Sequence, residues 1–388
     1  MQVPFDPLTP EYLSDPHPQN KLLRDEAPCT WSDAAQSWVV SRYEDCKFVL
    51  RENELFARDA TRAGRARIDS SRSIQTEDPP SQLILRRRMM KALHAQDLTE
   101  IAREAFDVLA GVMRDVPAGA EVDVLRLGAA PAAMSLISRT LGVEGMDPAT
   151  YLRASTDLTR AMDSGFDPSR LPAGMAAGDG LRAQVRTWFA AEPTDGMLKV
   201  LESDPIVASE LDAKGPRYLA NTVGGIFNAG FSTSFAIVGA LLQLHFQDPD
   251  VLPRARAAEG RDLAINELIR YLSPAQATSR FAVDDIEMHG QRIQRGQAVI
   301  TLMASANRDE REFEDPDDIV LDRALNRHLG FAWGPHVCLG AQLATAWMGI
   351  LIERQEDWLG GMEFVSASRV DSATLRTCDS ALLRREQA

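Results

Sequence analysis

One long apolar segment, from Tyr218 to Phe246, constrains the fold of this chain most. About twenty apolar residues suffice to cross a lipid bilayer, so its length alone would permit a membrane span. Polar residues nevertheless interrupt it, among them Asn221, Asn228, Ser232, Thr233, Ser234 and Gln243. Polar groups on several faces suit a helix inside a large soluble protein, where it can touch a ligand. The segment therefore predicts a buried central helix.

The rest of the chain has the composition needed to bury such a helix. Of 388 residues, 45% are hydrophobic and 25% are charged, which is typical of globular proteins. We find no internal repeat or long linker, and we expect a single domain over 1–388. The net charge of -14 argues against a nucleic-acid partner. The N-terminus lacks a secretory signal and a flanked anchor, so we expect a cytoplasmic, monomeric protein that binds no membrane.

Helical spacing of apolar residues dominates the remainder of the chain. The expected helices are 20–26, 43–51, 99–118, 125–141 and 342–353. Strand signals are fewer and shorter. The expected strands are 38–40, 279–283, 286–288 and 298–301. These patterns predict a mainly α fold with small β-sheets, an α+β architecture.

A cysteine lies on a shaped loop directly before one of these helices. The stretch from Phe331 to Ala341 contains two glycines, a proline and Cys338. The N-terminus of a helix has unpaired N–H groups and a partial positive charge, which favour a thiolate that can bind a metal. A turn around a buried thiol is the alternative for this loop alone. The other cysteines form no C-x-x-C pair, and we expect them to be buried: Cys29, Cys46 and Cys378.

Glu267 and Arg270 form a charged pair at i and i+3, which are neighbouring positions on one helical face. The apolar side of the same helix carries Ile265, Leu268, Ile269 and Leu272. The pattern leaves two interpretations of the pair. It is either a solvated surface pair or a structural pair inside the fold.

The cysteine loop and the charged pair, in this order and separated by a short β region, resemble the cytochrome P450 family over nearly the whole chain. Further matches are Asp-Pro-His-Pro at 15–18, the segments 38–45, 78–80 and 306–309, and Ala229-Gly230 followed by Thr233. The resemblance implies a cytochrome P450 fold with haem b between the long central helix and the cysteine loop. It makes Cys338 the axial thiolate of the haem iron, which favours O–O cleavage. It also makes Glu267 and Arg270 a structural pair facing that loop.

The resemblance also implies contacts to the two haem propionates, whose charges need partners wherever they are buried. His336, Arg280 and Arg86 match these contacts. Two positions near the cysteine loop and the propionate contacts depart from the family's pattern. Gln82 stands where a histidine is usual, so one propionate contact is weakened or replaced. Ala332 stands where a glycine is usual.

In the long helix, the family usually places an acid directly before a threonine, and this pair delivers protons to the oxygen site. Thr233 matches the alcohol and Ser232 replaces the acid, so these are the expected catalytic residues. Because Ser232 cannot ionise in a useful pH range, it can relay a proton only through water. Three function classes stay open: a monooxygenase driven by a ferredoxin and its reductase, a peroxide-driven peroxygenase, and a haem-binding sensor or carrier. We expect the first.

Two features concern partners and substrate. A basic strip follows Pro80 and comprises Arg87, Arg88, Lys91 and His94. The resemblance implies that it receives an acidic ferredoxin, and a merely solvated face is the alternative. Ile226, Phe227 and Phe231 are expected to line a pocket for a hydrophobic small molecule. Five arginines could meet a carboxylate or phosphate of the substrate, or pair with acids on the surface: Arg58, Arg62, Arg65, Arg67 and Arg72.

Overall fold

The computed structural model describes residues 3–66, 72–193 and 195–387, and helices dominate them. The first helices are α1 (Pro10–Ser14), α2 (His17–Glu26), α3 (Tyr43–Arg51), α4 (Leu83–His94), α5 (Leu98–Arg114), α6 (Ala130–Leu141), α7 (Pro148–Ala161) and α8 (Leu171–Ala190). The later helices are α9 (Gly196–Glu202), α10 (Pro205–Lys214), α11 (Pro216–Gln247), α12 (Val251–Ala257), α13 (Arg261–Leu272), α14 (Met303–Ala306), α15 (Ala341–Glu353) and α16 (Gln355–Leu359).

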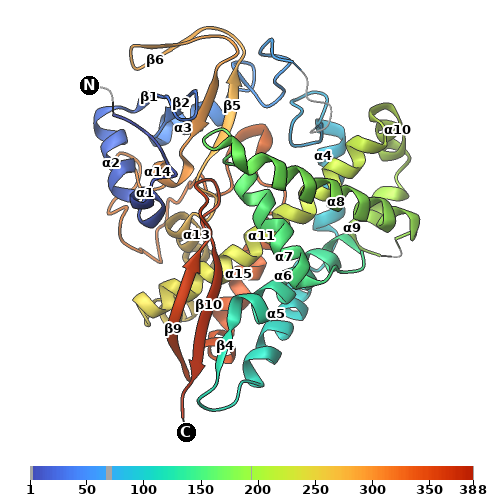
Figure 1. The fold of residues 1–388 in the computed structure, drawn as a ribbon, viewed down its shortest axis with the longest axis vertical. Helices are drawn as coiled ribbons and strands as arrows, with labels where there is room; N and C mark the ends of the chain where they lie inside the picture. Colours follow the sequence, from blue (N-terminus) through green and yellow to red (C-terminus); the bar gives the residue numbers. More distant parts are fainter. Residues whose placement is uncertain (1–2, 67–71, 194, 388) are drawn as a thin grey trace.

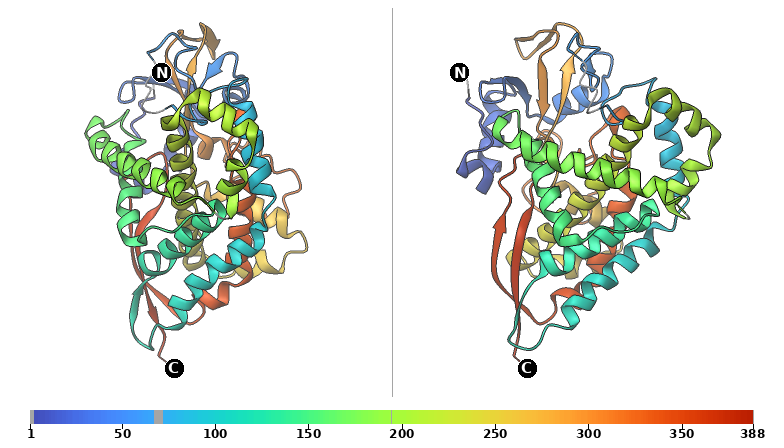
Figure 2. Two further views of the ribbon diagram at one scale, coloured as in Figure 1. Left: turned by 90° about the vertical axis from the view of Figure 1, so that its right-hand side faces the viewer. Right: turned by 45° about the vertical axis from the view of Figure 1, so that its right-hand side comes forward.

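The strands form small sheets, as the sequence predicts. They are β1 (Cys29–Ser32), β2 (Ser37–Val40), β3 (Phe56–Ala57), β4 (Glu121–Asp123), β5 (Thr278–Ala282), β6 (Ile286–Met288), β7 (Gln291–Ile293), β8 (Ala298–Thr301), β9 (Met362–Arg369) and β10 (Cys378–Arg385). The largest sheet has the order β1-β2-β8-β5-β3, with β2 and β8 parallel and the other pairs antiparallel. A second sheet has the order β4-β10-β9, and β6 pairs with β7. Figure 1 and the side views in Figure 2 place the largest sheet and the C-terminus at opposite ends of the molecule.

The long apolar segment forms α11, which runs through the middle of the helical part of the molecule (Figure 1). Helices α6, α7, α8 and α15 contact it. Among the described helices, α11 is the one long and apolar enough to cross a membrane, and 61% of its most apolar window is buried inside the protein. This burial confirms that the segment is a central core helix of the fold.

Several element boundaries differ from the sequence-based expectations, and each has a local cause. Helix α5 ends at Arg114 instead of continuing to 118, because Pro117 lacks a backbone N–H and its ring disfavours helix in the preceding residue. The expected helix at 125–141 begins with a π-helical turn, Leu125–Ala129, and continues as α6. Helix α2 begins at His17 rather than at residue 20, with Pro18 in its first turn.

Candidate functional site

The loop before α15 holds Cys338 in a fixed position. The Cys338 N–H donates to the carbonyl of Phe331 over 2.8 Å, and the Val337 N–H donates to the carbonyl of Gly334 over 3.1 Å. Gly334 has φ +72°, and a Cβ there would lie 2.7 Å from the carbonyl oxygen of Leu50 in α3. Only glycine suits both the left-handed backbone and this close approach. The loop is therefore a rigid support anchored on α3.

The thiol of Cys338 differs from the other thiols of the chain because it is solvent-accessible, whereas Cys29, Cys46 and Cys378 are buried as expected. Surrounding protein raises the pKa of the Cys338 thiol above its ordinary value, and this effect exceeds the opposing effects of the Gly340 N–H and of Arg86. The helix start alone thus does not produce a free thiolate, contrary to the simplest sequence argument. A bound metal cation would deprotonate the thiol outright.

Ala332 has φ +57°, a left-handed conformation in a residue that carries a Cβ. This backbone region costs a non-glycine residue about 1–2 kcal/mol, and glycine escapes most of that cost. The strain explains why a glycine would suit this position, and it makes Ala332 a weak point of the loop.

We expect the Ala332→Gly substitution to raise the free energy of unfolding by about 0.5–1 kcal/mol, because relief of the strain exceeds the added entropy of the unfolded chain. Urea denaturation measures the change. The matched control is Ala95→Gly, at an exposed position of ordinary φ -78°, which should lower stability. An Ala332→Gly protein that loses stability as the control does would refute the strain.

A buried cationic cluster lies beside the cysteine loop, where strand β5 meets the segment before α4. The Arg280 side chain is 2% exposed, and burial together with the nearby Arg58 guanidinium lowers the pKa of Arg280 to about 9. Among the described residues, its guanidinium donates only to the carbonyl of Ser279. Asp78 supplies the one nearby carboxylate, and its Oδ1 lies 2.9 Å from His336 Nε2.

Arg86 and Gln82 face the same region from α4 and its N-cap. Arg86 donates to the carbonyl of Val337, next to Cys338, and in the described chain it has no carboxylate partner. Gln82 is fully buried, and its Oε1 accepts no hydrogen bond in the described chain. Its Nε2 lies 3.5 Å from His336 Nε2. Three predicted propionate contacts, His336, Arg280 and Arg86, thus lie close to the cysteine loop or to one another.

The donor set of this region suits a ligand with two negative charges. Arg58, Arg86 and Arg280 bring three guanidinium groups, whereas Asp78 alone offsets them from inside the cluster. Buried cations without carboxylate partners are costly unless a ligand supplies the missing anions. The carboxylates of the two expected haem propionates would meet this need. The sequence analysis considered Arg58 for a charged substrate and did not predict its place beside Arg280.

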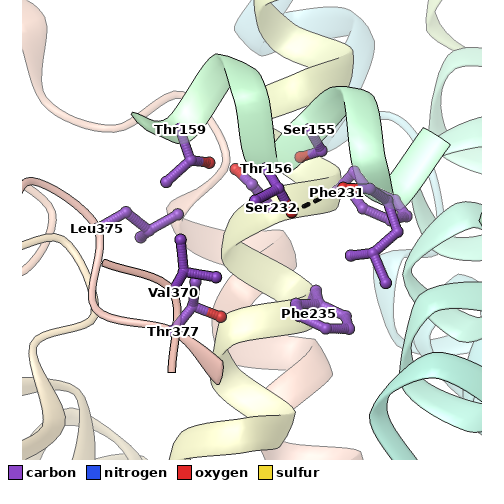
Figure 3. Close-up of a pocket in the computed structure, with 10 residues that line it drawn as sticks. Ser155, Thr156, Thr159, Phe231, Ser232, Phe235, Val370, Leu375 and Thr377 are labelled. Atoms are coloured by element: carbon purple, nitrogen blue, oxygen red, sulfur yellow. Dashed lines mark hydrogen bonds between the residues drawn. The ribbon is translucent and has the colours of Figure 1, made fainter. Parts of the chain in front are cut away.

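The middle of α11 presents an accessible face inside an otherwise buried helix. Ala229 is exposed and Thr233, one turn later, is half-buried. The Thr233 Oγ1 donates to the Ala229 carbonyl over 2.7 Å. The Trp347 indole of α15 donates to the Ser234 carbonyl over 3.1 Å, which fixes the helix after the cysteine loop against this part of α11. Ser232 points to a different side, toward α7 (Figure 3).

The interpretation of Glu267 and Arg270 as a solvated surface pair is wrong, because both side chains are fully buried. Their two hydrogen bonds measure 2.8 and 2.9 Å. Burial alone would raise the pKa of Glu267, but hydrogen bonds from Arg270, Arg323 and the Val320 N–H hold it below its usual range. Arg270 also donates to the carbonyls of Asn307, Pro316 and Asp318. The pair therefore joins α13 to the loop at 307–326.

The basic strip on α4 is partly free. Arg87, Lys91 and His94 are exposed, whereas Arg88 pairs with Asp204 over 3.1 Å. The strip lies on the helix whose inner side brings Arg86 to the cysteine loop. A surface next to the thiol thus carries positive charge.

Two of the arginines between residues 58 and 72 form ion pairs, which weakens the idea that these two meet a charged substrate. Arg62 binds Glu54, Arg72 binds Glu77, and Arg65 donates to the Gly296 carbonyl. Arg67 lies outside the described residues. Of the expected pocket residues, Phe227 is packed in the core against Tyr151 and Trp188. Ile226 is half-buried, and Phe231 lines a small pocket next to α7.

Comparisons with known proteins agree with this architecture. A sequence model of the family described as Cytochrome P450 matches residues 262–354. Nocardicin C N-oxygenase from Nocardia uniformis subsp. tsuyamanensis is 30% identical over 342 residues, which cover 85% of this chain and 84% of the relative. Vitamin D3 dihydroxylase from Streptomyces griseolus is 29% identical over 343 residues, covering 84% and 82%. The crystal structure of CYP109E1 from Bacillus megaterium in complex with testosterone has a TM-score of 0.83, with 24% identity and coverage of 97% and 99%.

The helical fold, the accessible cysteine before α15 and the cationic cluster fit the family that the comparisons name. The chain belongs to the cytochrome P450 family. It is an oxidoreductase of the monooxygenase class, and the family implies a haem-iron cofactor. The predicted fold class is confirmed.

Proposed function

We propose that this protein binds haem b through Cys338 and inserts one oxygen atom from O2 into a hydrophobic small molecule, with electrons from a ferredoxin and its reductase. The observation that carries the proposal is the accessible Cys338 on its rigid loop, close to a cluster of three arginines that Asp78 offsets only in part. When bound, thiolate-ligated haem supplies O2 activation and O–O cleavage. The residues of this chain would bind the cofactor and hold the proton near the oxygen site.

Each predicted cofactor contact has a task that follows from its surroundings. Arg280 and Arg86 would bind the propionates as charge-assisted hydrogen-bond donors. His336 Nε2 lies 2.9 Å from Asp78 Oδ1, and this contact fixes the orientation of its ring, so that the imidazole would face the neighbouring propionate. The Gly340 N–H points at the Cys338 sulfur and would temper the electron density of the thiolate.

The oxygen site would lie over the accessible face of α11. Thr233 is suited to hold a proton at its Oγ1, because this hydroxyl is half-buried and anchored on the Ala229 carbonyl. A hydrophobic substrate fits the proposal because the relatives include a vitamin D3 dihydroxylase and a P450 solved with testosterone.

The function as a whole is tested by screening hydrophobic compounds for a change in the haem spectrum on binding. Compounds that bind are then supplied with O2, ferredoxin, its reductase and NADH, and separately with hydrogen peroxide alone. The proposal expects an oxygenated product in the first arm. Product with peroxide alone would instead identify a peroxygenase, and spectral binding without product in either arm would identify a haem-binding protein.

The proposed electron entry is the exposed pair Arg87 and Lys91 on α4. Replacing both with Glu should slow reduction by ferredoxin about tenfold or more at low salt, because complementary charge raises association rates by about 10–10³-fold. Stopped-flow absorbance of the haem measures the rate at several salt concentrations.

The matched control replaces Arg384 in β10 and the nearby Arg126 with Glu; these arginines pair with Glu121 and Asp379. Figure 1 shows β10 and α4 on opposite sides of the molecule. This control carries the same change in net charge and should leave the rate near that of the native protein. Equal rates for the two double variants, or a native rate that does not depend on salt, would exclude α4 as the docking surface.

A further inference from the structure

Arg58 lies in the cationic cluster, directly after strand β3, and shares a hydrogen-bond acceptor with Arg280. Its Nη1 donates to Thr278 Oγ1 over 3.3 Å and to the Ser279 carbonyl over 3.2 Å. The Arg280 Nη1 donates to the same Ser279 carbonyl over 2.8 Å. Two guanidinium groups this close repel each other, and burial lowers the pKa of both. An anion bound by the two groups would remove this cost.

The nearby carboxylate of Asp78 already accepts from other donors. Its Oδ1 accepts the Arg58 backbone N–H over 3.1 Å and lies 2.9 Å from His336 Nε2. Its Oδ2 accepts the Asp59 N–H over 2.9 Å and lies 3.5 Å from Arg62 Nη1. Within the described residues, the Arg58 guanidinium forms no ion pair and its Nη2 makes no hydrogen bond. Arg58 therefore keeps a free donor for an anion.

Arg58 also holds the segment at 72–77, which lies against the first half of α11. The Arg58 Nε donates to the Gln75 carbonyl over 3.1 Å. The N–H of the residue before Gln75 donates to Thr222 Oγ1 in α11 over 3.1 Å. A Cβ at Gly225 would lie 3.1 Å from the Gln75 Oε1, so the Gln75 side chain rests on α11 one turn before the accessible face of that helix. The guanidinium thus connects the cationic cluster to this segment.

We propose that Arg58 and Arg280 together bind one haem propionate, and that Arg58, once held by this anion, fixes the segment at 72–77 against α11. This assignment rests on the proposed function, because it requires haem beside Cys338. A propionate suits the site because a carboxylate can accept charge-assisted hydrogen bonds from two guanidinium groups at once. A carboxylate of the substrate offers the same chemistry, but Arg280 is only 2% exposed, which favours the resident cofactor.

The first test is the rate at which ferric haem leaves the holoenzyme for an excess of apomyoglobin. Arg58→Gln should raise this rate about tenfold, because a hydrogen bond between two charged groups is lost. Arg58→Lys keeps the charge and should restore part of the retention. The matched control is Arg65→Gln, at an exposed arginine that donates to the Gly296 carbonyl, and it should release haem at the native rate.

Haem dimethyl ester separates propionate binding from a structural role of Arg58. Its two ester groups carry no negative charge, so the native protein and Arg58→Gln should release it at the same rate. A native protein that binds no haem would refute the proposed function. A native protein that binds haem, with Arg58→Gln releasing ordinary haem at the native rate, would refute this inference alone. An equal effect of Arg58→Gln on both haems would also overturn it.

The effect on the segment is measured by hydrogen exchange of the backbone N–H groups at 73–77, without substrate. Loading with haem should slow this exchange in the native protein and in Arg65→Gln, because the bound propionate holds Arg58 and with it the Gln75 carbonyl. Haem should have little effect on the exchange in Arg58→Gln. Slowing of the same size in Arg58→Gln and in the native protein would contradict the link between the propionate and the segment.

Discussion

Replacing Glu267 with Ala should lower the free energy of unfolding by about 3–5 kcal/mol and leave little haem-loaded protein, because it strands two buried arginines. Arg270 is fully buried, and the Arg323 side chain is 9% exposed. Glu267 accepts hydrogen bonds from both, from the Val320 N–H over 2.8 Å and from Asn326 over 3.0 Å. Removing the carboxylate leaves their charges without compensation in the interior.

The position of this network explains why haem content should fall with stability. Arg270 fixes the loop at 307–326 through three carbonyls, and this loop leads directly into the cysteine loop. The neighbouring Asn307 side chain accepts from the Leu329 N–H over 2.6 Å, at the start of that loop. Loss of the network should therefore loosen the support of Cys338.

The measurement is urea denaturation together with haem absorbance per mole of protein. The matched control is Glu353→Ala, which removes an exposed ion pair with Arg261 and should change stability by no more than about 1 kcal/mol. Similar losses of stability and haem content in both variants would show that Glu267 contributes no more than a residue of an ordinary surface ion pair.

The pH dependence follows from the same network. The pKa of Glu267 is lower in the folded than in the unfolded protein, so its contribution is present above the unfolded pKa of about 4.3 and is lost as the pH falls below it. The difference in unfolding free energy between the native protein and Glu267→Gln should therefore shrink on acidification. A constant difference between pH 7 and pH 3 would contradict this.

The central helix and the cysteine loop could be predicted from the sequence because each combines a strong pattern with a local cause. Apolar residues spread over most of α11 require burial on several faces, and the glycines and proline before α15 shape a loop without help from distant residues. The boundaries of α3 and β8 were also predictable, since apolar periodicity and turn residues coincide there.

The hairpin of β9 and β10 could not be predicted in this way. All of β9 except Met362 is exposed, so no apolar face alternates along it. Strand β10 has shifts in its register with β9 near Cys378 and Leu382, and these interrupt its pattern. Its pairing depends on contacts with β4, far away in the sequence.

The burial of Glu267 could not be predicted from the sequence, although the burial of its apolar neighbours in α13 could. Apolar spacing locates one buried face of α13, and it leaves the other face unspecified. That face is covered by the irregular loop at 307–326, whose path no periodicity reveals. The pocket beside Ser232 could not be predicted either, because its lining residues come from α7, α11 and the 370–377 segment, which are far apart in the sequence.

The largest functional effect is expected for Cys338→Ser, which should abolish thiolate ligation and the proposed monooxygenation while leaving the fold in place. Among the described cysteines, Cys338 is the exposed one, so no other thiol is positioned to substitute for it. The matched control is Cys378→Ser, at a buried thiol that accepts a hydrogen bond from Gln243. This control should keep the haem spectrum and the turnover of the native protein.

The most direct test of the account is the absorption spectrum of the reduced, carbon monoxide-bound protein. Thiolate ligation by Cys338 predicts a strongly red-shifted Soret band in the native protein and in Cys378→Ser, and its loss in Cys338→Ser. An ordinary haem-protein spectrum in the native protein, or a red-shifted band that persists in Cys338→Ser, would contradict it.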